Sequence, residues 1–202
     1  QDTIAYYKEF EKEKIVYPDI ATVLSFILDK HNMFMNNTCY FLNFGEINKY
    51  AISILNSIII DWYFRGISAQ LGNKALRHFN IYVENLPIPK IPRPQQIPFE
   101  NLVDCILFAK EHNMESEASL FESVIDGMVY DLYFADDMKT ANCYITDRIA
   151  EILSPFPQDE NDKSKTGYIN RLHNLCKTDK IISSSLANRK KIRVVEIVEG
   201  RG

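Results

Sequence analysis

The sequence of 202 residues lacks the features that usually mark a catalytic or metal site. Its seven glycines do not cluster, so it contains no glycine-rich phosphate loop and no dinucleotide-binding motif. The four cysteines lie far apart and form no Cys-x-x-Cys pair, a spacing that disfavours structural zinc and favours reduced thiols. The four histidines are isolated in the sequence. We therefore expect no catalytic residue, no metal ligand and no cofactor in this chain.

The sequence also lacks a segment suited to cross a membrane. Its longest apolar stretch, residues 50–64, contains Asn56, Ser57 and Asp61 and is shorter than the roughly 20 apolar residues of a bilayer span. The N-terminus has no signal-peptide layout and begins with Gln1 rather than methionine. We expect a cytoplasmic protein with no membrane partner, and a chain that is a piece of a longer protein.

Charge is distributed unevenly along the chain. The net charge of −4 at first disfavours a nucleic-acid partner. However, residues 61–98 carry a net charge of +3 and residues 163–202 one of +7, whereas residues 99–162 carry −12. A polyanion can meet the two basic blocks while the acidic block faces water or a partner. Phosphate contacts and pairing with the acidic helices explain the basic tail, Arg189, Lys190, Lys191 and Arg193, equally well.

Hydrophobic patterning predicts an α+β fold. Short runs of β-branched and aromatic residues predict strands at residues 14–20, 23–29 and 38–44, with a turn at Asn36-Asn37 before the third strand. Apolar residues at helical spacing predict one long amphipathic helix over residues 47–65. The first half should therefore form a small mixed or antiparallel sheet with a long helix.

The second half of the pattern is mainly helical. Residues 66–82 lose all periodicity and predict an irregular loop, and the five prolines within residues 86–98 predict an extended segment. Several amphipathic helices follow, with a closing strand at residues 192–198. We expect two domains, residues 1–98 and a mainly helical region 99–202 that packs on the first or extends it.

Polar and basic side chains concentrate in the irregular loop and in the turn before the third strand. Lysine and arginine neutralise phosphates or bond guanine edges, whereas asparagine and glutamine can bond adenine through two hydrogen bonds. On composition alone, a solvated polar loop explains these residues equally well. The aromatic residues Tyr17, Phe41, Trp62 and Phe64 are expected in the core rather than as stacking platforms. The candidate DNA-contacting residues are Asn36, Asn37, Thr38, Arg65, Ser68, Gln70, Asn73, Lys74, Arg77, His78, Asn80 and Lys90.

Three segments in the first half are similar to one known family. They read KEKIVYPDI, then NNTCYFL, then ISILNSIIIDWYFRGISAQLGNKALRHFNIYVENLPIPKIP. Residues 14–92 resemble the TaqI-like C-terminal specificity domain, which occurs in type II restriction–modification enzymes that fuse an adenine methyltransferase to a target-recognition module. The stretch LPIPKIPRPQQI also resembles the segment that closes a recognition domain in type I specificity subunits.

The resemblance implies that this chain recognises the sequence of double-stranded DNA and that chemistry resides elsewhere. It implies an N-terminal methyltransferase domain in the same parent chain, which uses S-adenosylmethionine, and Mg for any cleavage. The recognition module and the methyltransferase clamp the duplex, and the target adenine is flipped into the catalytic pocket. The alternative is a protein-interaction module whose acidic helical half docks a methyltransferase or another subunit of a restriction or phage-defence system.

Overall fold

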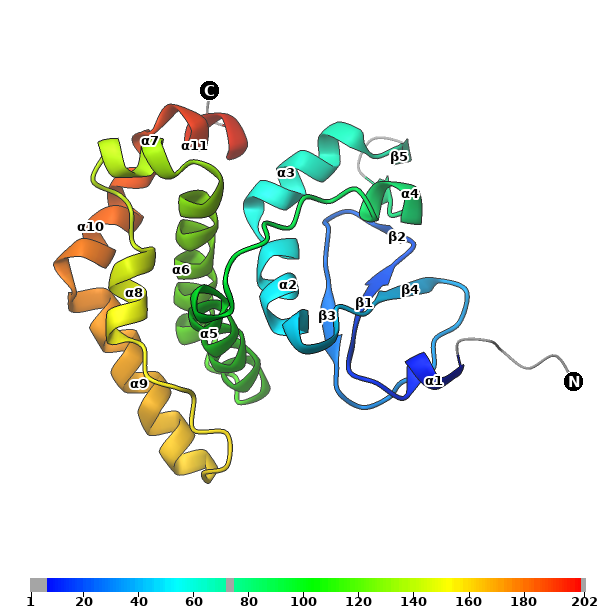
Figure 1. Ribbon diagram of the computed structural model, residues 1–202, viewed down its shortest axis with the longest axis horizontal. Coiled ribbons are helices and arrows are strands. Elements are labelled where there is room, and N and C mark those ends of the chain that lie inside the picture. Colours follow the sequence, from blue (N-terminus) through cyan, green and yellow to red (C-terminus); the bar gives the residue numbers. More distant parts are fainter. Residues whose placement is uncertain (1–6, 72–74, 201–202) are drawn as a thin grey trace, which may run out of the picture. The chain divides into compact units, whose positions relative to one another are not determined.

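Residues 7–71 and 75–200 are described by the computed structural model, and their helices and short antiparallel strands confirm the expected α+β class (Figure 1). The chain divides into two compact units. Unit 1 comprises residues 1–56 and 60–88, and unit 2 comprises residues 57–59 and 89–202. Among the described residues, no helix combines the length and the apolar character needed to cross a bilayer.

Unit 1 contains two small antiparallel sheets. In the first, β1 (Lys14–Pro18) is the central strand between β3 (Ile27–Asp29) and β4 (Cys39–Leu42). Helix α2 (Asn48–Leu55) packs against β1 and β3, and this explains why nearly every residue of β1 is buried. In the second sheet, β6 pairs with both β2 and β5. The remaining bounds in unit 1 are α1 (Tyr7–Phe10), β2 (Ile20–Ala21), η1 (Gly45–Ile47), α3 (Ile58–Ile67), β5 (Gln70–Leu71), β6 (Ala75–Arg77) and α4 (Asn80–Val83).

A buried ion pair fastens β1 to β3. Lys14 and Asp29 face each other in the strand register, their side chains are fully buried, and the ammonium group contacts the carboxylate. Asp29 also accepts hydrogen bonds from the backbone N–H groups of His31 (2.8 Å) and Met33 (2.9 Å). Although burial raises the pKa of Asp29, the hydrogen bonds from Lys14, His31 and Met33 hold it below its usual value. The charged pair therefore holds β1 against β3, and Asp29 also fixes the turn that follows β3.

The expected long helix over residues 47–65 is in fact two helices, α2 and α3. The break falls at Asn56, whose side chain accepts from the N–H of Phe26 and donates to its carbonyl, both at 2.9 Å. The amide thus pairs with the backbone as a neighbouring strand would, and for this reason residues 23–26 do not continue β3 as expected. The loop expected at residues 66–82 also contains β5, β6 and the start of α4.

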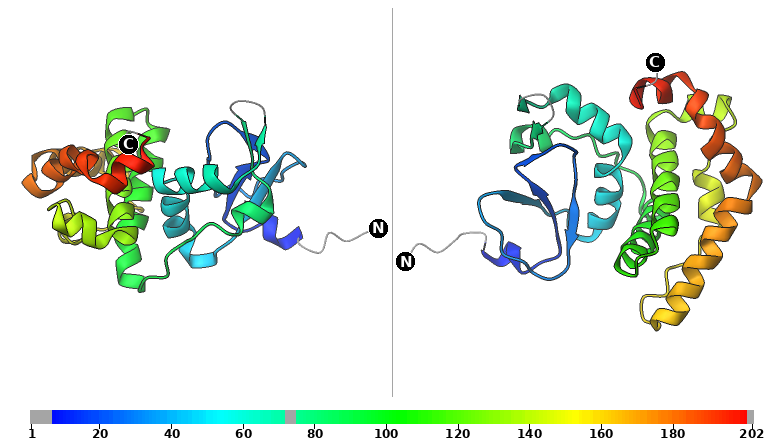
Figure 2. Two further views of the ribbon diagram at one scale, coloured as in Figure 1. Left: turned by 90° about the horizontal axis from the view of Figure 1, so that it is seen from above. Right: turned by 180° about the vertical axis from the view of Figure 1, so that it is seen from behind.

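Every regular element described in unit 2 is a helix. The long helices α5 (Arg93–Glu111) and α6 (Glu115–Tyr133) lie side by side, and α9 packs on both (Figure 2). The other elements are α7 (Ala135–Thr140), α8 (Thr146–Ile152), α9 (Asp162–Thr178), α10 (Lys180–Asn188), η2 (Arg189–Lys191) and α11 (Arg193–Val198).

Two expectations about unit 2 are wrong. The proline-rich segment was expected to stay extended to residue 98, yet α5 begins at Arg93. Pro94 lies in its first turn, where a missing N–H costs nothing, whereas Pro98 lies further inside the helix. The closing strand expected at residues 192–198 is the helix α11, which buries Val195 and Val198. Its β-branched residues favour a strand only when a partner strand is available.

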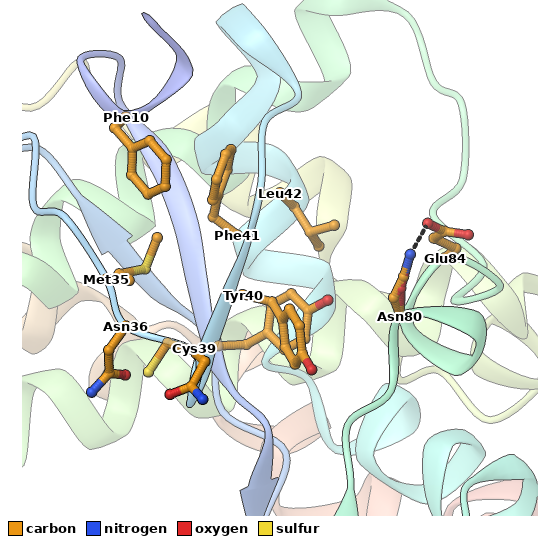
Figure 3. A pocket seen from close by; sticks show the side chains of 11 residues that line it. Phe10, Met35, Asn36, Cys39, Tyr40, Phe41, Leu42, Asn80 and Glu84 are labelled. Atoms are coloured by element: carbon orange, nitrogen blue, oxygen red, sulfur yellow. Dashed lines mark hydrogen bonds between the residues drawn. The ribbon is translucent and has the colours of Figure 1, made fainter. Parts of the chain in front are cut away.

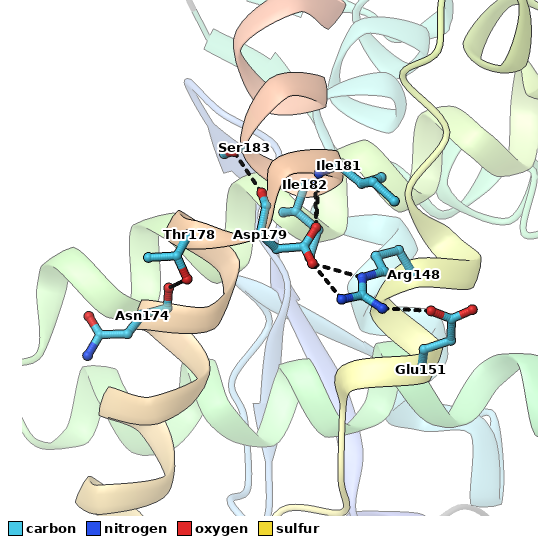
Figure 4. A network of polar contacts seen from close by, with 8 residues as sticks. All are labelled: Arg148, Glu151, Asn174, Thr178, Asp179, Ile181, Ile182 and Ser183. Carbon is cyan, nitrogen blue, oxygen red and sulfur yellow. Dashed lines mark hydrogen bonds and ion pairs between the residues drawn. The ribbon is translucent and has the colours of Figure 1, made fainter.

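Two aspartates connect the shorter helices of unit 2. Asp179 caps α10 by accepting from the N–H groups of Ile181 and Ile182, and its other oxygen accepts from Arg148 of α8 at 2.7 and 2.8 Å (Figure 4). Asp131 of α6 accepts from the N–H of Ile145, and from the N–H and hydroxyl of Thr146, at the start of α8. Both carboxylates thus fix the ends of helices that are too short to be stable alone.

Replacing Asp131 by asparagine is expected to make unfolding less dependent on pH. Burial raises the pKa of Asp131 to about 6, whereas an unfolded aspartate titrates near 3.9, so the native protein binds the proton more readily. Its stabilising contribution is present below about pH 4 and is lost as the pH rises through 6. Between about pH 4.5 and 7.5, wild type should lose about 2 kcal/mol relative to Asp131→Asn. Urea unfolding followed by circular dichroism measures this difference, and parallel pH profiles would refute it.

Candidate nucleic-acid interface

A pocket of about 680 Å³ opens in unit 1 beside β4. Its lining comes from three separate segments: the end of α1 and β1, the turn and strand 35–42, and helix α4. Figure 3 shows these side chains converging from different parts of the chain. Three of the candidate DNA-contacting residues line it, namely Asn36, Asn37 and Asn80.

Aromatic rings form the apolar part of the pocket. Tyr17 and Tyr40 lie with their ring centroids 5.6 Å apart, and Phe10 and Phe41 lie 5.1 Å apart. Burial raises the pKa of Tyr17 to about 12, with smaller contributions from Tyr40 and the negative charge of Glu84. The Tyr17 hydroxyl therefore keeps its proton under physiological conditions.

The turn before β4 carries a hydrogen-bond donor at the edge of the pocket. The Asn36 side-chain oxygen accepts from the backbone N–H of Thr38 at 3.0 Å and from its hydroxyl at 2.5 Å. This Asx turn fixes the amide orientation, and the Nδ2 group of Asn36 is left to donate elsewhere. Asn36, Asn37 and Thr38 are all exposed, and Asn36 and Asn37 form a polar edge of the pocket at the turn predicted from sequence.

Helix α4 presents the opposite kind of group. Asn80 donates from Nδ2 to the carboxylate of Glu84 at 2.7 Å, one helical turn further on. This bond uses one of the two hydrogens on the Asn80 amide nitrogen, and the Asn80 oxygen and the second Glu84 oxygen are left as a pair of acceptors. In Figure 3 the Asn80–Glu84 pair lies on the far side of Tyr40 from Asn36.

Both arginines among residues 1–88 are paired with aspartates. Arg65 contacts Asp61 at 2.7 Å and donates to the carbonyl of Thr22 at 3.1 Å, so it anchors the loop after β2. Arg77 contacts Asp19 at 3.0 Å, and its guanidinium lies 4.8 Å from the ring centre of Phe79. Each guanidinium is neutralised within the unit, which reduces what it can add to phosphate binding.

Two further candidates lie inside unit 1. His78 is fully buried, its Nδ1 lies 2.9 Å from the carbonyl of Pro18, and its ring meets Phe64 edge-on. Ser68 is half-buried, and its hydroxyl has no hydrogen-bond partner. The His78 side chain therefore acts inside the unit, next to the end of β6, rather than at its surface.

Exchange of His78 for asparagine is expected to remove a pH-dependent step in the stability of unit 1. Burial lowers the pKa of His78 below 6.5, so below that pH the unfolded chain binds a proton that the folded chain does not. Stability is therefore complete above pH 6.5 and falls by up to about 1.4 kcal/mol per unit as the pH drops. Trp62, the single tryptophan, lies in unit 1 and reports its unfolding. An equal loss at low pH in His78→Asn would contradict this assignment.

The other candidates are spread more widely. Lys90 is exposed and belongs to unit 2. Gln70 lies in β5, and Asn73 and Lys74 lie outside the described residues.

In the basic tail, Arg189 is buried and donates to the carbonyl of Ser123 at 2.7 Å. A Cβ at Gly127 would come within 2.7 Å of that guanidinium. Pairing within unit 2 thus explains Arg189, whereas Lys190 and Lys191 are exposed.

The aromatic residues follow expectation only in part. Tyr17 and Phe64 are buried and Phe41 is half-buried, but Trp62 on α3 is 42% exposed, so its assignment to the core is wrong. Sequence reasoning also missed Glu84, Tyr40 and Cys39 as pocket residues. The spacing of four residues between Asn80 and Glu84 was a usable signal for their pairing, since such side chains meet on a helix.

Within residues 7–71 and 75–200, no group of three or more histidine, cysteine, aspartate or glutamate side chains is arranged to hold a metal ion. No curated protein matches the chain. The family model of the TaqI-like C-terminal specificity domain matches residues 1–88, and this match confirms the resemblance drawn from the sequence. Over these 88 of its 202 residues the chain is similar to that family of specificity domains, which supports a DNA-recognition role for this part of the chain.

Proposed function

We propose that this chain is the target-recognition part of a type II restriction–modification enzyme that methylates adenine in duplex DNA. The parent protein carries a methyltransferase domain before this segment, binds S-adenosylmethionine there, and uses Mg if it also cleaves DNA. The fragment itself performs no chemistry. Its task is to hold the duplex so that one short sequence is presented to the methyltransferase, in the cytoplasm of a bacterium.

The proposal rests on one observation: the pocket lies within the residues that the family model matches. The match covers residues 1–88, and within them the pocket gathers Asn36, Asn37 and Asn80 from segments more than 40 residues apart. Asparagine amides bond base edges in the major groove. Both arginines of this region are paired with aspartates, so phosphate contacts from residues 1–88 should come mainly from lysines, and the pocket amides should supply base contacts.

Methylation of plasmid DNA by the full-length parent tests this function. Single-molecule sequencing should find modified adenines in one short sequence context. Exchanging residues 66–82 for the loop of a relative with another target should shift that context. Marks that stay in the original context after the exchange would place recognition elsewhere, and an absence of marks would refute the methyltransferase parent.

One observation favours protein docking as a second function. Residues 99–162 carry a net charge of −12, which repels DNA phosphates and suits a basic protein surface. Reversing acidic residues of α6, such as Glu115 and Glu117, should then weaken assembly with the partner subunit while target preference persists. Co-purification of the parent complex at several salt concentrations measures that assembly, and unchanged recovery would remove this function.

A further inference from the structure

We propose that the Asn80–Glu84 pair reads the exocyclic amino group of an adenine or a cytosine in the major groove. The inference rests on the proposed DNA-recognition function and adds to it the class of base that this chain selects and the residues that select it.

The hydrogen-bond directions within the pair carry the argument. Asn80 donates one of its two Nδ2 hydrogens to Glu84, and the Asn80 oxygen and the second Glu84 oxygen are acceptors. In the major groove, the donors on base edges are the amino groups of adenine N6 and cytosine N4, whereas guanine and thymine offer acceptors at those positions. The two oxygens therefore match adenine or cytosine, and the Glu84 carboxylate, which has no hydrogen to donate, opposes guanine or thymine.

The charge of the pair restricts its position on the duplex. Glu84 is exposed, and among the described residues that line the pocket with it there is no lysine or arginine. A carboxylate next to a phosphate is repelled, while the same carboxylate opposite an amino group gains a charge-assisted hydrogen bond. The pair is thus suited to a base edge and unsuited to the DNA backbone.

Asn36, on the other side of the pocket, adds a hydrogen-bond donor to the acceptors of the Asn80–Glu84 pair. The Asn36 oxygen is committed to Thr38, so Asn36 offers a donor where α4 offers acceptors. A donor matches purine N7, guanine O6 or thymine O4. The pocket therefore has two walls of opposite polarity with Tyr40 between them, and at about 680 Å³ it is large enough to admit base edges.

Cys39 provides a direct test of whether DNA occupies this pocket. It lines the pocket and is half-buried, whereas the other three cysteines of the chain are buried. In the full-length protein, the thiol reactivity that disappears in Cys39→Ser is the reactivity of this residue. A target duplex at ten times its dissociation constant should slow that reaction about ten-fold, and a non-target duplex at the same concentration should slow it much less.

The second measurement tests the base class. Using the target sequence found with the full-length protein, each adenine or cytosine is replaced by an analogue that lacks the amino group, such as purine for adenine. At one of these positions, the replacement should lower the affinity of the wild-type protein for the duplex about 10- to 100-fold. This penalty should shrink several-fold in Glu84→Gln, because a glutamine amide can turn its donor outward, and it should persist in the control Glu46→Gln, which lies outside the pocket.

The outcomes separate this inference from the function on which it rests. Protection of Cys39 together with a reduced penalty in Glu84→Gln supports it. Selective duplex binding with an unprotected Cys39, or with the same penalty in Glu84→Gln, overturns the inference and leaves the recognition function standing. Absence of selective duplex binding by the full-length protein overturns both.

Discussion

Replacing Lys14 by methionine should destabilise unit 1 by about 3–5 kcal/mol, the usual cost of removing one partner from a buried ion pair. The side chains of Lys14 and Asp29 are both fully buried, so the remaining carboxylate would have no water to solvate it. Hydrogen bonds from His31 and Met33 would persist, but they compensate a negative charge only partly. Since single domains are stable by only about 5–15 kcal/mol, a large share of the folding free energy is at stake.

Lys12→Met provides the matched control for this prediction. Lys12 pairs with Glu9 on the surface at 2.6 Å, and such pairs contribute only about 0–1 kcal/mol. Urea unfolding followed by Trp62 fluorescence measures both variants, because the single tryptophan lies in unit 1. Similar losses in the two variants would show that the buried pair has no special role. Selective DNA binding should fall together with the stability of Lys14→Met.

Replacing Asn36 by aspartate should reduce selective DNA binding by about 10- to 100-fold. An aspartate oxygen can still accept from the N–H and hydroxyl of Thr38, so the turn should keep its shape. The variant lacks the amide donor and places a negative charge where a base acceptor would lie. The loss should therefore appear in DNA binding with little change in the free energy of unfolding.

Asn43→Asp introduces the same charge in the same unit without touching the pocket. Asn43 also forms an Asx turn, accepting from the N–H of Gly45 at 2.8 Å, and it donates to Glu9 at 3.2 Å, so the free energy of unfolding of Asn43→Asp is measured beside its DNA binding. Fluorescence anisotropy with target and non-target duplexes separates the two variants. If Asn43→Asp weakens target binding as strongly as Asn36→Asp, general repulsion explains the effect and Asn36 does not contact bases.

The parts of the fold that local sequence determines were predictable. The β-branched and aromatic runs of β1 and β4 indicated strands, and the 3.6-residue spacing in α5 and α6 indicated helices. The break between α2 and α3 was not predictable from periodicity, because Asn56 forms its bonds with Phe26, 30 residues earlier. Likewise α11 has strand-like residues but is a helix because its apolar side chains pack within unit 2.

The candidate site divides in the same way. Asn36, Asn37 and Asn80 were found by residue type, and the fold brings them to one pocket. The pairing of Arg77 with Asp19 joins residues 58 apart and is invisible to local patterning, as is the burial of His78. Glu84 is not a candidate when only basic and amide side chains are considered, although a carboxylate acceptor also discriminates between bases.

The central claim is that residues 1–88 read a DNA sequence through the pocket beside β4. Selection of duplexes from a random pool tests it, with the full-length protein and with the same protein carrying Asn36→Asp and Glu84→Gln. We expect wild type to enrich one short sequence and the double variant to enrich a different or less specific one. Enrichment of the same sequence by both proteins, or of none by wild type, would contradict the account.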